Sequence, residues 1–173
     1  MSLLETLNFL ARVYTDANLR REFLSAPERI GKENALTAEE ICEIVEIFPD
    51  EINAFAESLF WKRLREVEKL LPLTRRSLNA EFERLFREFS PDFNPPSIKK
   101  HLEDALCFGR FLQKSAAVSE LAKNAAKFEG AKLEFYAVHK NFIVRYFDFD
   151  IQTGERKKHF KIWLRIGKRE VVF

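Results

Sequence analysis

The stretch Lys157-Lys158-His159-Phe160-Lys161-Ile162-Trp163-Leu164-Arg165-Ile166 decides the fold of the C-terminal part of the chain. From Phe160 onward every second residue is apolar, and the residues between them are basic or aromatic. A strand turns alternate side chains to opposite faces, so this alternation predicts a strand. The apolar set that we expect to enter a core is Phe160, Ile162, Leu164 and Ile166. The set that we expect to face solvent is Lys157, His159, Lys161, Trp163 and Arg165.

The basic set suits an anionic partner that is also partly aromatic or apolar. Together with Lys168 and Arg169, which follow the strand, it forms a predicted partner-binding surface. A peptide would bind such a strand by augmentation, with main-chain hydrogen bonds for affinity and alternate side chains for specificity. A second interpretation is structural: edge strands often carry Lys and Arg to prevent aggregation, and the helical body then covers Trp163.

The residues on either side of this strand extend it into a small sheet. From Asn141 the apolar period is two, which predicts a strand through residues 142–147. The sequence Gln152-Thr153-Gly154-Glu155 predicts a hairpin connection, and Gly167-Lys168 predicts a tight turn before a strand at 170–173. The expected result is a three-stranded antiparallel meander over residues 140–173.

Residues 1–139 show helical periodicity and predict a helical domain of about six to seven helices, with N-terminal helices in 1–49 and a helical core in 50–139. Thr37 and Glu40 form a capping box, which marks the start of a helix. Pro27, Pro49 and Pro72 are expected to end or break helices. The fold class predicted for the whole chain is therefore α+β, a mostly helical body followed by an antiparallel sheet.

Composition indicates an ordinary globular chain of 173 residues, 46% of them hydrophobic. Charge is unevenly spread: residues 1–50 hold 5 basic and 10 acidic side chains, whereas residues 140–173 hold 9 and 4. No stretch has the length of a membrane span or the pattern of a signal peptide. Cys42 and Cys107 have no disulfide or redox spacing and are expected to be buried small hydrophobes, which suits a reducing, cytoplasmic setting.

The sequence does not predict an active site, a metal centre or a cofactor. Its three histidines are isolated, and its five glycines form no phosphate-binding loop. An enzyme would need polar groups converging on a pocket, and the only cluster to inspect is His101 with Glu103, Asp104 and Cys107. The simpler interpretation of that cluster is a histidine beside acids on a helix surface.

A second basic feature lies in residues 61–76. One interpretation is a solvated helix face whose charges are balanced at helical spacing. The other is a docking patch for an acidic partner or phosphates, beside the break at Pro72. The residues of this predicted patch are Lys62, Arg63, Arg75 and Arg76.

The segment from Phe55 to Tyr136 also carries a set of residues in a familiar order. The set is Lys62-Arg63, Val67, Leu71 to Arg76, Leu78, Phe82, Leu85-Phe86, Phe89, Pro95-Pro96, Asp104-Ala105, Phe108, Phe111-Leu112, Leu121-Ala122, Phe128-Glu129, Ala131, Leu133 and Tyr136. This order resembles a bacterial family first described as DNA-binding domains. Related partner proteins accompany multinuclear non-heme iron enzymes that modify cysteines in ribosomal peptides. The stretch from Tyr14 to Leu24 is similar to uncharacterised relatives of that group.

The resemblance implies a helical domain that docks to a TIM-barrel iron enzyme and C-terminal strands that engage the leader of its precursor peptide. It implies no catalytic residue on this chain, because the iron ligands would belong to the enzyme. The first function hypothesis is therefore a non-catalytic adaptor for a protein or peptide. The alternative is a nucleic-acid-binding protein, with bases stacked on Trp163 and phosphates held by the basic residues around it. An enzyme is the third hypothesis.

Overall fold

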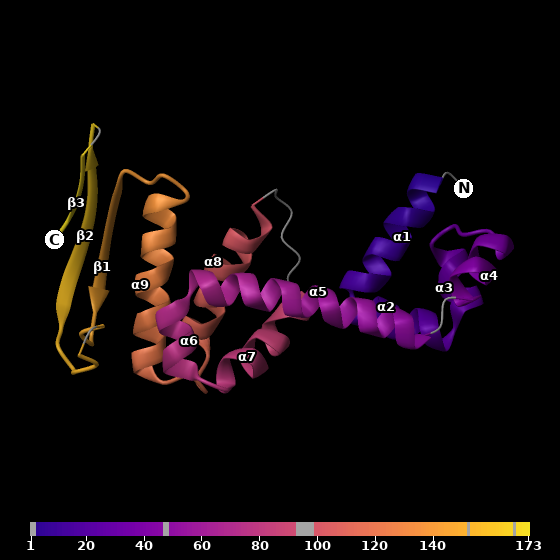
Figure 1. The fold of residues 1–173 in the computed structure, drawn as a ribbon, viewed down its shortest axis with the longest axis horizontal. Coiled ribbons are helices and arrows are strands. Elements are labelled where there is room, and N and C mark those ends of the chain that lie inside the picture. Colours follow the sequence, from indigo (N-terminus) through magenta and orange to yellow (C-terminus); the bar gives the residue numbers. More distant parts are fainter. Residues whose placement is uncertain (1–2, 47–48, 93–98, 152, 168) are drawn as a thin grey trace. The chain divides into compact units, whose positions relative to one another are not determined.

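The computed structural model describes residues 3–46, 49–92, 99–151, 153–167 and 169–173. It confirms the α+β class: the described residues form nine α-helices, rather than six to seven, and a C-terminal three-stranded antiparallel sheet. The chain divides into two compact units, Met1–Lys62 and Arg63–Phe173, and the sheet belongs to the second (Figure 1). None of the described helices has the length and apolarity needed to cross a membrane.

The first unit is built from α1 (Leu3–Thr15), α2 (Ala17–Ser25), α3 (Pro27–Glu33), α4 (Ala38–Glu46) and the beginning of α5 (Pro49–Leu70). The predicted capping box is confirmed, since Glu40 N donates to Thr37 Oγ1 at 3.2 Å and Thr37 N donates to Glu40 Oε2 at 2.8 Å. The core of this unit is a cluster of buried apolar residues: Phe9, Val13, Phe23, Ile30, Leu36, Ile41, Ile44 and Ile52.

Prolines begin helices in this chain, which explains the higher helix count. Pro27, Pro49 and Pro72 stand at the first position of α3, α5 and α6 (Pro72–Leu78). The first turn of a helix has unpaired N–H groups in any case, and proline already has a helical φ, so it is favoured there. The sequence prediction was right that helices end near these prolines and that a long helix follows Pro49, but it missed the short helices that begin at Pro27 and Pro72.

The helical part of the second unit is organised around phenylalanine rings. It contains the end of α5, then α6, α7 (Glu81–Phe89), α8 (Lys100–Lys114) and α9 (Glu120–Tyr136). Phe108 of α8 lies 5.2 Å from Phe82 and 5.1 Å from Phe86, both in edge-on geometry. Such ring pairs stabilise the fold beyond the area that they bury.

Two buried carboxylates tie the helices of this unit together. Asp104 of α8 receives two hydrogen bonds from Arg63, at 2.7 and 3.0 Å. Glu129 of α9 accepts from the backbone N–H groups of Leu73 and Thr74 at 2.7 and 2.9 Å, and from the Thr74 hydroxyl at 2.6 Å. Glu129 therefore caps the start of α6 from another helix. Its burial raises the pKa of its carboxyl group, although these hydrogen bonds oppose the shift.

The sheet consists of β1 (Phe142–Phe147), β2 (His159–Ile166) and β3 (Arg169–Val172), in the order β1-β2-β3. Both pairings are antiparallel, with Ile143 opposite Trp163 and Trp163 opposite Val172. Helix α9 runs along one face of this sheet (Figure 1). The small core between them is formed by Ala131, Phe135, Ile143, Phe147 and Trp163.

Candidate functional site

The face of the sheet that contacts α9, here called the inner face, is the opposite of the one predicted. Trp163 is only 1% exposed and lies 5.9 Å from the ring of Phe128 of α9. Its cross-strand partner Ile143 and the neighbouring Phe147 are also buried. The prediction that Trp163 faces solvent is therefore wrong, and the expectation that the helical body covers it is confirmed. The expectation that this strand lies at the edge of the sheet is wrong, because β2 is paired on both sides, with β1 and β3.

Basic side chains share this inner face because they lie over aromatic rings. Lys161 Nζ is 4.9 Å from the centre of the Phe128 ring, and the Arg165 guanidinium is 4.9 Å from that of Phe135. Arg165 also donates to the carbonyl of Phe135 at 3.2 Å and to Glu170 at 2.8 Å. Long cationic side chains can cover apolar surface while their charged ends stay partly hydrated, so these residues stabilise the sheet rather than forming a free binding face.

The other residues of the predicted strand surface are not brought together with these. His159 is half-buried, and its ring stacks on that of Phe147 at 5.5 Å. Lys157 and Arg169 are exposed. Lys168 lies outside the described residues. A single solvent-facing basic surface is therefore not formed, and a nucleic-acid platform would lack its stacking ring because Trp163 is buried.

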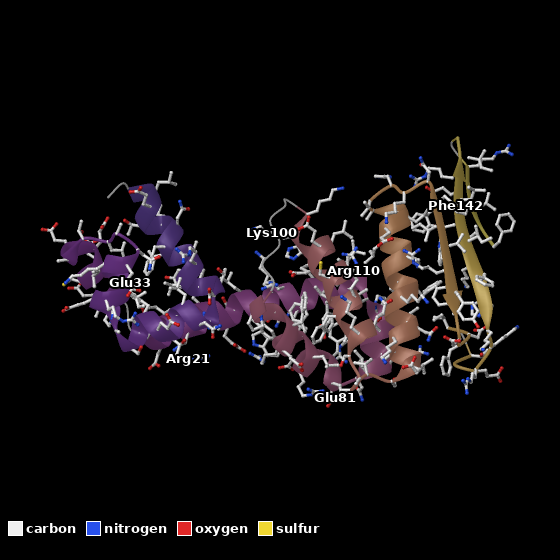
Figure 2. All side chains as sticks on the ribbon, turned by 180° about the vertical axis from the view of Figure 1, so that it is seen from behind. Arg21, Glu33, Glu81, Lys100, Arg110 and Phe142 are labelled. Atoms are coloured by element: carbon white, nitrogen blue, oxygen red, sulfur yellow. The ribbon has the colours of Figure 1, made fainter. Side chains whose placement is uncertain are left out.

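The opposite face of the sheet, here called the outer face, is apolar and open. Strand alternation and the pairing register place nine apolar side chains on it, and Figure 2 shows side chains projecting from both faces of the sheet. Phe142, Phe160 and Ile166 are between 60% and 64% exposed, and Phe173 is 70% exposed. The full set is Phe142, Val144, Tyr146, Phe160, Ile162, Leu164, Ile166, Val171 and Phe173.

The predicted docking patch is not a free cationic surface either. Arg63 is half-buried and bonded to Asp104, with its guanidinium 5.9 Å from the Phe86 ring. Arg75 pairs with Glu68 at 2.6 Å and donates to the backbone carbonyl of Asn79 at 2.7 Å. Lys62 and Arg76 are exposed. Two of the four residues thus serve the fold of the second unit.

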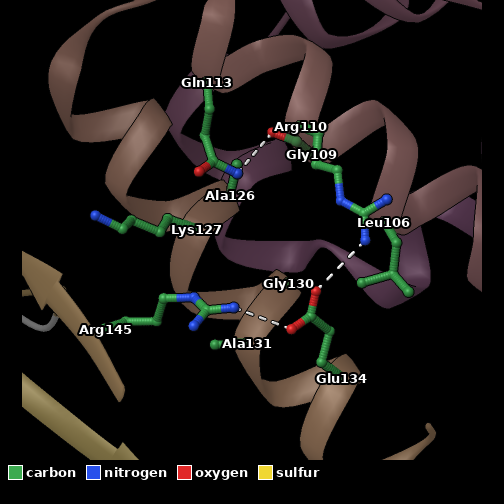
Figure 3. A pocket seen from close by; sticks show the side chains of 10 residues that line it. All are labelled: Leu106, Gly109, Arg110, Gln113, Ala126, Lys127, Gly130, Ala131, Glu134 and Arg145. Carbon is green, nitrogen blue, oxygen red and sulfur yellow. Dashed lines mark hydrogen bonds and ion pairs between the residues drawn. The ribbon is translucent and has the colours of Figure 1, made fainter. Parts of the chain in front are cut away.

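A groove between α8 and α9 gathers charges that the sequence analysis did not single out. Small residues let the two helices approach, and a Cβ atom added at Gly109 would lie 3.6 Å from the backbone oxygen of Ala126. The groove has a volume of about 100 Å³, and Arg145 reaches it from β1 (Figure 3). Its polar and charged lining residues are Arg110, Gln113, Lys127, Glu134 and Arg145. This surface is called the α8–α9 groove below.

The α8–α9 groove has more positive than negative charge. Its single carboxylate, Glu134, faces Arg110 at 3.5 Å, Lys140 at 2.9 Å and Arg145 at 3.0 Å. Burial by itself would raise the pKa of Glu134, but the hydrogen bond and charge of Lys140 and the charge of Arg145 outweigh it, so the pKa is lowered. Lys127 lies 5.7 Å from the Phe147 ring and, within the described residues, forms no ion pair.

The groove adjoins the free edge of the sheet. Because Arg165 N donates to the Asn141 carbonyl, the backbone groups of residues 143, 145 and 147 point toward β2. Those of Phe142, Val144 and Tyr146 therefore point away from it, along the open edge. Arg145 Nη1 donates to the Val144 carbonyl at 3.0 Å, while its Nη2 donates to Glu134. One guanidinium thus links the edge to the groove.

The cluster around His101 forms no convergent active site. Asp104 is bonded to Arg63, which leaves His101, Glu103 and Cys107 as neighbours on α8. His101 Nδ1 and Glu103 Oε2 are buried and have no hydrogen-bond partner in the part of the chain that the structure describes. Within the same residues, no three His, Cys, Asp or Glu side chains are grouped so that they could hold a metal ion. Cys42, expected to be buried, is exposed, and both cysteines are free.

The residues of the groove and edge could be found only in part from the sequence. Arg145 is the single charge in a six-residue apolar strand, which was a usable signal. Arg110 and Lys127 lie on different helices and are separated by seventeen positions, so no local spacing connects them. The chain matches no protein-family model, no curated protein and no solved structure. The family resemblance of residues 55–136 therefore stays a prediction.

Proposed function

We propose that this protein is a non-catalytic adaptor that binds a peptide segment of its partner as a fourth strand along β1. The observation that carries the proposal is the open edge of β1 beside a positively charged groove. An exposed apolar edge strand offers unpaired N–H and C=O groups to another chain. Peptides bind such edges through main-chain hydrogen bonds, and their alternate side chains provide specificity.

The groove defines the side chains that suit this edge. In an added strand, every second side chain would lie on the same side of the sheet as Arg145 and α9. Arg110, Lys127 and Arg145 line that side, against one carboxylate from Glu134. Asp or Glu at these alternate positions would be attracted by the excess of cations, because hydrogen bonds between ionised groups are stronger than those between neutral ones. The proposed ligand is therefore an extended peptide with acidic residues at every second position.

The resemblance noted in residues 55–136 supports a narrower version of this proposal. In that version the bound peptide is the leader of a ribosomally made precursor, and the helices of the chain dock to a TIM-barrel iron enzyme. The chemistry would then belong to the enzyme, and this chain would deliver the precursor. The two free cysteines suit action in the cytoplasm.

The test uses a matched pair of proline substitutions on the two edges of the sheet. Val144→Pro removes an N–H group that points along the free edge of β1, without removing a bond to β2. Val172→Pro makes the same change on the free edge of β3, because the backbone of Phe173 pairs with Ile162 and that of Val172 points away. Each tagged variant would be used to capture partners from nuclease-treated lysate of the source cells, with mass spectrometry of the eluate.

We expect a partner that is captured by the unmodified chain and by Val172→Pro but not by Val144→Pro. Charge reversal by Lys127→Glu should also weaken its capture, and more so at low salt, because Lys127 lines the groove. Equal capture by both proline variants would show that β1 is not the binding edge. A partner that is captured from untreated lysate but not from nuclease-treated lysate would support the nucleic-acid alternative instead.

A further inference from the structure

The outer face of the sheet is a second surface that the proposed function does not use. Five of its nine apolar residues are exposed and the other four are half-buried. On the inner face, β1 and β2 pack closely: Phe160 is 64% exposed, whereas Ile143 and its cross-strand partner Trp163 are 3% and 1% exposed. Phe160 forms a ring pair with Tyr146 at 5.0 Å across β1 and β2. Open apolar patches of this kind on soluble proteins mark interaction sites.

We propose that the outer face binds the outer face of a second copy of this chain, so that the protein is a homodimer with two sheets packed face to face. The charge of the surface favours this occupant. Along the paired strands the side chains of the outer face are apolar except for Arg169, which lies opposite Ile166 at one end of the β2–β3 pair. A surface almost without charge offers no complement to an acidic or basic partner, but it can meet its own copy without like-charge repulsion.

The area of the outer face is sufficient for a dimer. A whole aromatic side chain presents about 150–250 Å², so Phe142, Phe160 and Phe173 at their observed exposures leave roughly 400 Å² open. With Ile166 and the half-buried aliphatic residues, the outer face offers about 600 Å². Two such faces would bury about 1,200 Å², which is the lower end of the range for specific, stable complexes. We therefore expect a reversible dimer rather than an obligate one.

The geometry of such a dimer leaves the proposed peptide site accessible. Two sheets that pack face to face lie about 10 Å apart with their strands at about 30°. The contact is symmetric, because each copy contributes the same residues. The backbone groups of Val144 point along the sheet plane, and Arg145 lies on the inner side, so neither is covered by the second sheet. The inference does not depend on the proposed function.

The test measures the mass of the full chain in solution by light scattering coupled to gel filtration, over a range of concentrations. The unmodified chain should approach twice 20.4 kDa as concentration rises. Phe160→Glu changes an outer-face residue of the middle strand, β2. This variant should stay at 20.4 kDa at ten times the concentration at which half of the unmodified chain is dimeric. Leu7→Glu is the matched control, because Leu7 is 52% exposed and lies on α1 of the first unit. It should dimerise like the unmodified chain.

The fold of the variants can be checked independently, since Trp163 lies on the inner face. In a Trp61→Phe background, unchanged Trp163 emission would show that the sheet still packs on α9 in Phe160→Glu. A chain that stays monomeric at several hundred micromolar would overturn the inference, and so would a Phe160→Glu variant that still dimerises. If dimers were lost in Val144→Pro but kept in Phe160→Glu, the copies would be pairing edge to edge, which also contradicts the proposal.

Discussion

Replacing Trp163 with alanine distinguishes the two possible orientations of the sheet. The indole is 1% exposed and contacts the rings of Phe128 and Phe147, at 5.9 and 6.4 Å. Removing a fully buried tryptophan in a packed core typically costs about 3–5 kcal/mol. Phe160→Ala is the matched control: it removes a ring from the same strand, but from the outer face where 64% of the residue is exposed. We expect it to cost less than about 1 kcal/mol.

The measurement is urea unfolding of the full chain followed by circular dichroism, which does not depend on the removed fluorophore. Because the chain has two compact units, the curves would be fitted with two transitions, and Trp163→Ala should shift only one of them. It should be carried out at low protein concentration, so that loss of a dimer in Phe160→Ala does not contribute. If Trp163→Ala cost less than 1 kcal/mol while Phe160→Ala cost several, the inner and outer faces would be reversed.

Three further predictions concern buried or shared carboxylates. Glu129→Ala leaves the backbone N–H groups of Leu73 and Thr74, in the first turn of α6, without an acceptor. We expect the free energy of unfolding, measured with a chemical denaturant, to fall by about 2–5 kcal/mol. A fall of less than about 1 kcal/mol would mean that water replaces the carboxylate as the acceptor. Asp104→Ala removes the carboxylate that pairs with Arg63 and should lower the free energy of unfolding by about 3 kcal/mol. Part of this stability should be recovered in the double variant that also carries Arg63→Met. The pKa of Glu134 is lowered in the folded chain, so its ionised form adds stability at pH values above the ordinary carboxyl pKa, and this stability is lost as the pH falls through the lowered pKa. Glu134→Gln should therefore make stability depend less on pH in the acid range, and an unchanged dependence would contradict the ion-pair cluster.

The helices and the existence of the sheet could be predicted because local signals define them. The capping box at Thr37 and the period of two after Asn141 both correspond to observed elements. The end of α9 is less well defined by its sequence, because Leu133 and Phe135 are also spaced as on one face of a strand; in the structure this segment is helical and α9 ends at Tyr136. Tertiary contacts decide such boundaries where local propensity does not.

The orientation of the sheet could not be predicted by counting apolar residues. In β1 both alternate sets are largely apolar, and in β2 the more apolar set is the outer one. The inner set is nevertheless stabilised, because Lys161 and Arg165 lie over rings supplied by α9. A rule that places apolar side chains inside treats these cations as solvent-facing. To predict the orientation of the sheet, one would need to know which aromatic residues of α9 face it, and this depends on tertiary packing.

The order of contacts along the chain also has a consequence for how the second unit folds. Strand β1 follows α9 after five residues, and each later strand pairs with the one before it, so no connection among α9 and the three strands is longer than the eleven residues between β1 and β2. The bonds from Arg63 to Asp104 and from Thr74 to Glu129 instead span 41 and 55 residues. Contacts near in sequence form faster than distant ones. We therefore expect α9 and the three strands to assemble early, and the closure of α5 and α6 onto the phenylalanine cluster to set the folding rate.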